Sequence, residues 1–480
     1  MRDIEEILKA KSIHTFACPF QFKAEFAKQL LEKLQQKGWR QKNLDFMVKK
    51  QASQDAIDCF MRYQYFSQSA RDIFINQEMN ICHVYEYPFD ARKQYQYYVK
   101  KEDKDDKGNK ENKEFYLPID EIELHIYSHG AGILFIRVLN SNYNVSDIKK
   151  INDYGRRTCI PYLADKDSFL LCADELGIII DKNIYNTVKF REMIDQYLEG
   201  TLSEYQQLTR QAQFLYDLLN CNLEHNQIND IEVNLLSDDR MFVCTIIRDT
   251  QLSKAIENKE YDEKELYPIL FMDAKSATCQ DKNMREQLYA DAVYPRWLDW
   301  GTIYNATSYS LCCITTEYDG VNASVIRPFI IEYSYFVSLV LAQRIGIMAF
   351  ADRAGKIVAE MGEGRLKRKQ SDELIDLQKQ YIKFKNQILI MEASTQEQGI
   401  EIYHLLQNQM MIKEEQGILH DQLQGLYEIS NISMGNRFSI YGLVLAIAAI
   451  LVDLVINVTV VCIQDKVRLL DFILRLRKIF

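Results

Sequence analysis

Residues 121–139 read EIELHIYSHGAGILFIRVL, and this stretch decides the fold of the region around it. Two apolar runs flank its central residues 128–132, SHGAG. Glycine readily adopts the positive φ of a tight turn, so two apolar runs joined by a glycine-containing turn indicate a β-hairpin. The sequence therefore predicts two antiparallel strands here, joined by this turn.

Other segments on either side of the hairpin have strand or helix patterns. Strand-like runs occur at 81–88, 169–180, 230–248, 269–274 and 310–318, and helical spacing occurs at 24–34, 187–198 and 203–220. The charged run 100–114 is interpreted as a solvated loop. A similar mix of elements occurs around 121–180 and again around 205–318. We therefore predict an α+β cytosolic region with two ferredoxin-like halves, divided into subdomains 1–165 and 166–328.

From about Phe329 the pattern becomes helical, and it stays helical up to residue 436, which predicts a long helical stalk at 329–436. Within this stalk, Leu405, Ile412, Leu419 and Leu426 recur every seven residues, as in the seam of a coiled coil. We therefore expect self-association along the stalk. A single amphipathic helix packed back on the globular region is the alternative.

The most apolar segment is 438–463, FSIYGLVLAIAAILVDLVINVTVVCI. A helix of this length would extend about 39 Å, enough to cross a hydrocarbon core of about 30 Å, so we predict a transmembrane helix at 437–464. Asp453 and Asn457 are four residues apart and share a helix face. In an oligomer they would form a polar ring along a pore. A shallow or protonated Asp453 is the alternative.

The tail at 465–480 is basic and amphipathic. Its residues Arg468, Arg475, Arg477 and Lys478 are predicted to lie on an anionic membrane surface. This positive charge favours a cytoplasmic tail. The large N-terminal region is also expected in the cytoplasm, and one segment is too short to cross the membrane twice. Either the tail crosses despite its charge, or the segment is re-entrant within an oligomer.

Composition limits the compartment and the partners. The net charge of −10 disfavours direct nucleic-acid binding, because such proteins need a positive face. The eleven cysteines form no C-x-x-C pair, and many lie among apolar residues, as expected for reduced and buried thiols in a cytosolic region. The opening residues MRDIEEILKAKS lack the apolar run of a signal peptide. We expect a cell-membrane protein with most of its chain in the cytoplasm.

Three short strings carry a family resemblance: INDYGRR at 151–157, LAQR at 341–344 and EQGIEIY at 397–403. Together with the order of α/β region, stalk and membrane helix, they resemble the CorA-like magnesium transporter superfamily, in particular uncharacterised clostridial CorA-like membrane proteins. The resemblance covers about 121–430 in organisation. It implies a homopentamer that transports divalent cations such as Mg²⁺. CorA-like proteins also include membrane effectors of bacterial antiphage defence.

The sequence departs from the CorA pattern at two points. CorA proteins have two membrane helices per chain and a Gly-Met-Asn motif after the first, whereas this sequence has one convincing membrane segment. The nearest string, Met434-Gly435-Asn436, has a different order and precedes that segment. The residues therefore do not identify a magnesium selectivity site, and no cofactor beyond a divalent cation is expected.

Few residues stand out as a ligand or catalytic site. Arg156 and Arg157 are candidates for binding a small anionic or nucleotide ligand through bidentate contacts, with a packing role as the alternative. His125 and His129 could bind a metal, and the acidic run 260–265 could bind a divalent cation, with a solvated loop as the alternative. No P-loop, nucleophile elbow or H-E-x-x-H occurs, so an enzyme is the least expected class.

The whole pattern predicts an oligomeric membrane protein. Its cytosolic region would sense a ligand or partner, and the stalk would transmit that state to the membrane. A CorA-like channel or transporter for cations is the leading function. The alternatives are a ligand-activated membrane effector of antiphage defence and a non-conducting membrane-anchored scaffold.

Overall fold

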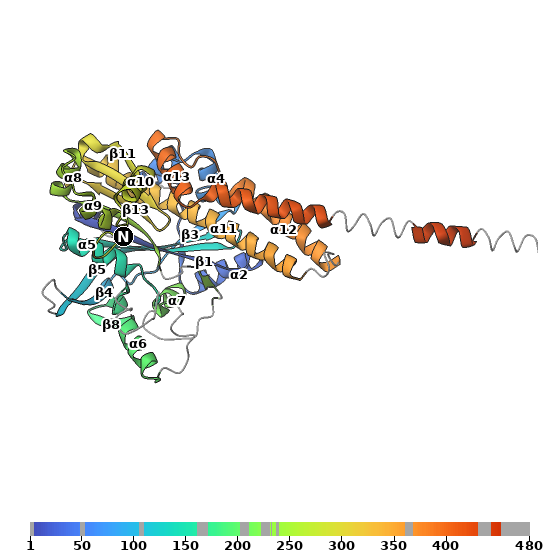
Figure 1. Cartoon of the computed structure of the whole chain (residues 1–480), viewed down its shortest axis with the longest axis horizontal. Helices are drawn as coiled ribbons and strands as arrows, with labels where there is room; N and C mark the ends of the chain where they lie inside the picture. The colour runs from blue at the N-terminus through green and yellow to red at the C-terminus, as the bar shows by residue number, and fades with distance from the viewer. Residues whose placement is uncertain are drawn as a thin grey trace, which may run out of the picture. The chain divides into compact units, whose positions relative to one another are not determined.

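The computed structural model describes residues 4–48, 53–104, 110–160, 171–201, 211–221, 231, 233–236, 240–360, 368–430 and 443–452. A large sheet and many helices confirm the predicted mixture of α and β structure (Figure 1). The strands are β1 (Ser12–Gln21), β2 (Arg40–Gln41), β3 (Cys82–Glu86), β4 (Tyr95–Lys104), β5 (Lys110–Tyr127), β6 (Ala131–Asn140), β7 (Glu175–Ile180), β8 (Asn183–Lys189), β9 (Asn234–Leu235), β10 (Phe242–Arg248), β11 (Val293–Trp297), β12 (Thr302–Thr307) and β13 (Ser310–Thr315).

Thirteen α-helices carry labels, and two further helices, at 412–430 and at Leu443–Val452, follow them in the described chain. The labelled helices are α1 (Ile4–Lys9), α2 (Ala27–Gln36), α3 (Gln54–Tyr65), α4 (Gln68–Phe74), α5 (Val145–Gly155), α6 (Phe190–Leu198), α7 (Gln213–Leu219), α8 (Thr250–Glu257), α9 (Glu263–Leu270), α10 (Lys282–Ala292), α11 (Ser334–Ala359), α12 (Arg368–Gln387) and α13 (Glu397–Gln409). Short 3-10 turns are η1 (Ala24–Phe26), η2 (Phe46–Val48), η3 (Gln77–Met79) and η6 (Leu298–Trp300), and two π-helical turns are η7 (Asn322–Ile326) and η8 (Phe329–Tyr333).

Within the described residues, one 13-stranded sheet organises the fold, with the main strand order β11-β12-β13-β10-β1-β6-β5-β4-β7-β8. β10 and β13 are parallel, and the other neighbours along this path are antiparallel. β1 pairs with β10, so strands from both 1–165 and 166–328 belong to one sheet. The division into two ferredoxin-like halves stays a prediction.

The hairpin predicted at 121–139 is confirmed as β5 and β6. The two strands are paired beside the turn at Ile126 and Gly132, and the pairing continues away from the turn. Gly130 in the turn has a φ of +100°, a conformation that favours glycine. A Cβ at this position would also lie 2.5 Å from the backbone oxygen of Phe22. The glycine in the turn is therefore required both by its backbone conformation and by the close approach of β1's end.

Several other predicted segments agree with the structure in type. The helix at 24–34 corresponds to η1 and α2, and the strands at 81–88 and 310–318 correspond to β3 and β13. The strand expected at 169–180 is described from Glu175 onward. The helix expected at 187–198 begins only at Phe190, because the preceding residues form β8.

The strand predicted at 269–274 is wrong, because Ile269 and Leu270 end α9. The side chain of Asp262 accepts a hydrogen bond from Lys264 N and caps this helix, which fixes its start at Glu263. Ile269 and Leu270 then become buried in an apolar cluster. A short apolar run does not by itself distinguish a buried helix end from a strand.

The loop predicted at 100–114 is also wrong at both ends, because β4 and β5 continue into it. Lys100 pairs with Glu114 and Lys101 with Lys113, and residues 105–109 lie outside the described residues. Lys101 is fully buried and its Nζ donates a 2.6 Å hydrogen bond to the carbonyl oxygen of Cys172. Backbone pairing and this contact hold a charged segment in the sheet.

No disulfide joins any of the ten described cysteines to another, and eight of the ten are buried. Burial raises the pKa of Cys172 to about 11, with opposing influence from Lys101. Their placement agrees with the expected role as small apolar side chains.

The helix Asn322–Ala359 is the one helix, within the described part of the chain, that is long and apolar enough to span a membrane. Its most apolar window is 78% buried within the protein, as in the central helix of a globular domain. Gln343 joins the α11 part of this helix to later segments of the chain. Its Nε2 donates to the carbonyl oxygen of Ile388 at 2.7 Å and to the hydroxyl of Tyr403 at 2.8 Å.

The chain forms two compact units, Met1–Phe350 with Gln380–Gly417, and Ala351–Lys379 with Ile418–Phe480. The helical stalk predicted at 329–436 is interrupted after α12 and again at Met411, which has a φ of +54°. A further helix covers 412–430. Ile412, Leu419 and Leu426 are buried within this chain, whereas Leu405 lies on α13. Self-association along the stalk stays a prediction.

Candidate functional site

The most unusual feature of the sheet is a buried charge network on one face of β5. Its pairing with β6 shifts register between Ile119 and Glu121, which places the extra residue Asp120 in a β-bulge. Arg137 on β6 contacts both acids, with Nε 2.7 Å from Asp120 Oδ2 and Nη2 2.5 Å from Glu121 Oε2. Burial disfavours the charged guanidinium, but Glu121 and Asp120 outweigh it and raise the pKa of Arg137. The bulge thus lets the carboxylates of Asp120 and Glu121 contact the same guanidinium, that of Arg137.

Lys42 extends the network toward β3. Its backbone N donates to Val84 O at 2.8 Å, which fixes the residue after β2. Its Nζ lies 2.7 Å from Glu121 Oε1 and also contacts Glu123 Oε1. Burial would lower the pKa of Lys42, but the attraction of Glu121 and Glu123 dominates and raises it. Burial would likewise raise the pKa of Glu123, yet Lys42 and His125 hold it well below its ordinary value.

His125 connects these charges to helix α11. Its Nε2 lies 3.5 Å from Glu123 Oε2, and its Nδ1 lies 2.8 Å from the hydroxyl of Ser338 on α11. The hydroxyl of Tyr127 also contacts Ser338, at 2.8 Å. A continuous series of polar contacts therefore runs from Glu121 through Lys42, Glu123 and His125 to this helix.

Arg62 of α3 adds a second connection to the start of the long helix. Its Nε donates to the carbonyl oxygen of Ile331 at 2.9 Å, and its guanidinium lies 4.9 Å from the ring centre of Tyr335. The neighbouring Glu332 is 2% exposed, and no described residue donates a hydrogen bond to its Oε1. Burial raises the pKa of Glu332 to about 8, against the opposing influence of Arg62. This carboxyl group is therefore neutral over much of the physiological range.

A cavity of about 380 Å³ borders the network. Asp120 and Glu121 form part of its wall, so the acids that hold Arg137 also line the cavity. The other lining residues are Arg40, Glu86, Tyr87, Phe89, Asp90, Ala91, Lys93, Gln94, Tyr95, Ile119 and Ile122. The ring centres of Tyr87 and Phe89 are 5.1 Å apart, and those of Phe89 and Tyr95 are 4.8 Å apart.

This arrangement favours a small organic cation or zwitterion over a bare anion. Four acidic and two basic side chains line the cavity, and its aromatic rings can stack on or attract a cation. A cationic group beside Glu121 would compete with Lys42 and Arg137 for the same carboxylate. Since those pairs are buried, rearranging them costs several kcal/mol, and binding would be coupled to the state of the network.

The predicted ligand residues Arg156 and Arg157 both turn toward Asp153 of α5. Arg156 Nη2 lies 3.2 Å from Asp153 Oδ1 and donates to Met272 O at 3.0 Å, and Arg157 Nη2 lies 3.1 Å from the same carboxylate oxygen. Asp153 Oδ2 accepts from Ala274 N at 3.2 Å. These contacts join α5 to the segment after α9, as the packing alternative anticipated. Ligand binding by either arginine stays a prediction.

The two histidines occupy different environments, and the acidic run caps a helix. His129 Nε2 contacts the carbonyl oxygen of Ala342 at 3.1 Å, and burial lowers the pKa of His129 to about 4. Asp262 and Glu263 lie at the start of α9. Across the described ranges, no group of three His, Cys, Asp or Glu side chains is placed to hold a metal. A Mg²⁺ site stays a prediction.

Asp453 and Asn457, and the surface residues Arg468, Arg475, Arg477 and Lys478, lie outside the described residues. The described part of the predicted transmembrane helix is the helix Leu443–Val452.

One feature of the sequence indicates the charge network, although Glu121 and Glu123 were not among the predicted site residues. Glu121, Glu123 and His125 alternate with Ile122, Leu124 and Ile126, so β5 has one polar face. Such a face is ordinarily solvent-exposed. Here α11 covers it, and Lys42 comes from far away in the sequence.

No family model matches the sequence, and the comparisons with curated proteins and with solved structures gave no match. The resemblance to CorA-like proteins therefore rests on the short strings and the order of segments alone.

Proposed function

We propose that this chain is a membrane-anchored sensor of CorA-like type. In this proposal the α/β unit binds a small ligand, and an oligomeric C-terminal membrane segment conducts cations. The observation that carries its membrane attachment is the helix Leu443–Val452, LVLAIAAILV, in which every residue is apolar and every residue is exposed.

An exposed apolar helix of this kind is unfavourable in water. Leu445 is 70% exposed and Ile450 is 64% exposed, and each Å² of apolar surface left in water costs about 25 cal/mol. The ten described residues would cover only about 15 Å, but the apolar sequence extends over 438–463, long enough for a bilayer of about 30 Å. A lipid environment is the simplest partner for this surface.

The charge network supports a sensing role for the α/β unit. It joins the cavity wall at Glu121 to Ser338 through side chains in direct contact. Ser338 belongs to α11, which continues without a break to Ala359 and so enters the second unit. A ligand that changed the pairing of Glu121 would therefore act on a helix shared by both units.

Membrane attachment is tested by charging the exposed helix. The triple variant Leu445→Lys, Ile447→Lys, Ile450→Lys is expected to move most of the protein from the membrane pellet to the soluble or aggregated fraction. Each lysine near the centre of a membrane helix costs about 2.5–3.5 kcal/mol. Alkaline extraction of membranes, followed by quantitative blotting, measures the distribution.

The matched control places three lysines on exposed apolar positions of the α/β unit, Met47→Lys, Val48→Lys and Ile57→Lys. This variant is expected to stay in the membrane pellet. Release of the wild-type chain by alkaline extraction would rule out integral insertion, whatever the variants do.

Conduction is tested separately in proteoliposomes loaded with a Mg²⁺ indicator. We expect Asp453→Leu to reduce the flux of the wild-type protein roughly tenfold or more, because a pore-facing carboxylate attracts cations. Val452→Leu, one residue earlier, is the control and should conduct as the wild type does. Absence of flux in the wild type, with protein incorporated and oriented, would favour the non-conducting scaffold.

A further inference from the structure

The cavity beside the charge network is lined by an adjacent cation and anion, Arg40 on β2 and Glu86 on β3. The two residues lie directly opposite each other in the antiparallel pairing of these strands. Residues in this position have their side chains on the same face of the sheet, with Cβ atoms about 4.5–5.5 Å apart. Within the part of the chain that the structure describes, neither side chain takes part in a hydrogen bond or an ion pair.

The other charged side chains of the lining already have partners. Asp120 and Glu121 contact the buried cations of the charge network. Asp90 accepts two hydrogen bonds from Arg92, at 3.0 Å from Nε and 2.9 Å from Nη2. Lys93 likewise has an interaction partner. Among the described lining residues, the cross-strand pair is therefore what remains to bind the charged groups of a ligand.

The second neighbour of Glu86 favours a positive group beside it. In the pairing of β3 with β5, Glu86 lies opposite Glu123. Like charges in opposite positions destabilise a sheet, and the ammonium group of Lys42 contacts Glu123. A positive group of a ligand beside Glu86 would offset this repulsion. The site thus favours a cation at Glu86 and an anion at the neighbouring Arg40.

An aromatic surface adjoins these two charges. Tyr87 directly follows Glu86, and its ring centre lies 5.4 Å from that of Trp39 and 5.1 Å from that of Phe89. The ring centre of Phe89 lies 4.8 Å from that of Tyr95. Tyr87 is buried, whereas Phe89 and Tyr95 are half-buried. Phe89 and Tyr95 therefore provide the part of this wall that an apolar group in the cavity can contact.

We propose that this cavity, the sensing site of the proposed function on which this inference rests, binds a free α-amino acid with an aromatic side chain. Its carboxylate would accept hydrogen bonds from the guanidinium of Arg40, and its ammonium group would donate to Glu86. An α-amino acid carries both groups on one carbon atom, which suits a cation and an anion on neighbouring strands. Its ring would pack against Phe89 and Tyr95. The volume of about 380 Å³ lies within the range of roughly 300–1,000 Å³ for small-molecule sites.

Binding of L-phenylalanine to the full-length protein in nanodiscs, measured by isothermal titration calorimetry, tests this site. Arg40→Gln and Glu86→Gln are each expected to weaken binding about tenfold or more, because each removes one charged hydrogen-bonding group. Both residues lie at the surface end of the cavity wall, Arg40 exposed and Glu86 half-buried. Thermal midpoints of the variants, measured in parallel, identify any loss of binding that reflects unfolding.

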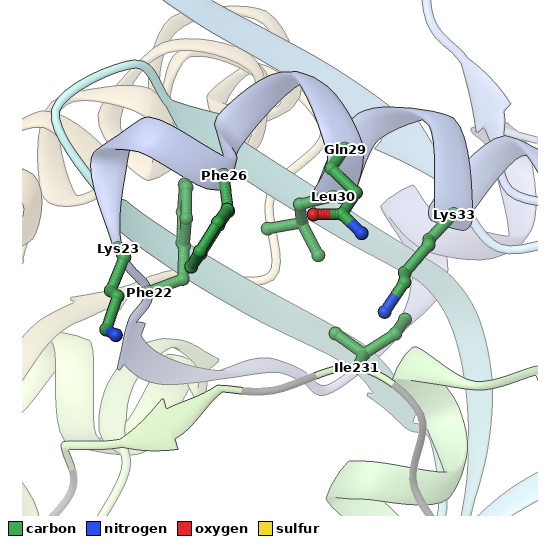
Figure 2. A pocket seen from close by; sticks show the side chains of 7 residues that line it. All are labelled: Phe22, Lys23, Phe26, Gln29, Leu30, Lys33 and Ile231. Atoms are coloured by element: carbon green, nitrogen blue, oxygen red, sulfur yellow. The ribbon is translucent and has the colours of Figure 1, made fainter.

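Two control variants remove a charge elsewhere. Glu78→Gln removes an exposed carboxylate on η3 that does not line the cavity. Lys23→Gln removes a cation from a separate cavity of about 230 Å³ along the beginning of α2. Figure 2 shows Lys23 at one end of that cavity, and the described residues that line it do not line the cavity beside the network. Both controls should bind L-phenylalanine as the wild type does.

Two analogues of L-phenylalanine test which group contacts which side chain. 3-Phenylpropionate lacks the ammonium group and phenethylamine lacks the carboxylate, so each should bind the wild type at least about tenfold more weakly. Glu86→Gln should bind L-phenylalanine and 3-phenylpropionate about equally, and Arg40→Gln should bind L-phenylalanine and phenethylamine about equally. Glycine should bind weakly because it has no ring to pack against Phe89 and Tyr95.

Four results would each overturn the amino-acid site: no binding at millimolar L-phenylalanine, equal binding of either analogue or of glycine by the wild type, unchanged discrimination in the two variants, or an equal loss in Lys23→Gln. Membrane extraction and ion flux are measured separately from this binding. An integral, conducting protein that did not bind amino acids would keep the proposed function and lose this ligand class. Binding that left the flux unchanged would support the site and overturn its coupling to conduction.

Discussion

Replacing Lys42 with methionine is expected to lower the free energy of unfolding by about 3–5 kcal/mol. Lys42 is 7% exposed and contacts Glu121 and Glu123, so its removal leaves two buried carboxylates with one fewer cation. Methionine has a similar volume, which limits the contribution of a cavity. Urea unfolding at neutral pH, followed by circular dichroism in detergent, measures the change.

Lys282→Met provides the comparison for this prediction. Lys282 lies 3.5 Å from Glu286, but the two side chains are 74% and 49% exposed. An exposed pair of this type contributes at most about 1 kcal/mol. A loss in Lys42→Met no larger than that in Lys282→Met would show that the buried network is not integral to the fold. Adding Glu123→Gln to Lys42→Met should recover part of the loss, because one uncompensated charge is removed.

Replacing Glu332 with glutamine is expected to raise stability in alkaline solution and to change it little near pH 5. Burial raises the pKa of Glu332 from 4.5 to about 8 in the folded protein. Between these two values the folded state holds a proton that the unfolded chain has lost, so stability falls as the pH rises through this window. The full decrease is on the order of 4–5 kcal/mol, and it is complete above about pH 8.

Unfolding in urea at pH 5, 7 and 8.5 tests this dependence. The glutamine variant cannot ionise, so its stability should exceed that of the parent by most of this amount at pH 8.5. Glu392→Gln removes an exposed carboxylate and should leave the pH profile of the parent unchanged. A parallel profile for the parent and Glu332→Gln would mean that Glu332 titrates normally in the folded protein.

The parts of the fold that could be predicted from the sequence are those with local signals. The hairpin has a glycine in its turn and apolar strands on both sides, and α2 has regular helical spacing. By contrast, Ile269 and Leu270 belong to a run too short to have a period, and they form the end of α9, whose start is capped by Asp262. Lys101 carries a charge, but a backbone partner across the sheet and the carbonyl oxygen of Cys172 keep it in β4.

The candidate site was harder to predict because its parts are distant in the sequence. Lys42 and Glu121 are 79 residues apart, and His125 and Ser338 are 213 residues apart. The polar face of β5 was visible as an alternation, but no local pattern indicated that a helix would cover it. Arg156 and Arg157 were visible as a pair, yet their partner Asp153 lies one helical turn earlier and accounts for their position.

The two π-helical turns before α11 determine where this chain can change length. A π-helical turn commonly corresponds to an α-helix with one inserted residue, so deleting a residue within Asn322–Ile326 would convert a wide turn to a regular one. The residues of these turns, which precede α11, can adjust their backbone to that deletion. An insertion between Ser338 and Gln343 would instead rotate all later residues of α11 by about 100° and separate Gln343 from Tyr403. Among natural variants of this protein, single-residue gaps should therefore occur before Ser334 and be excluded from the helix that follows.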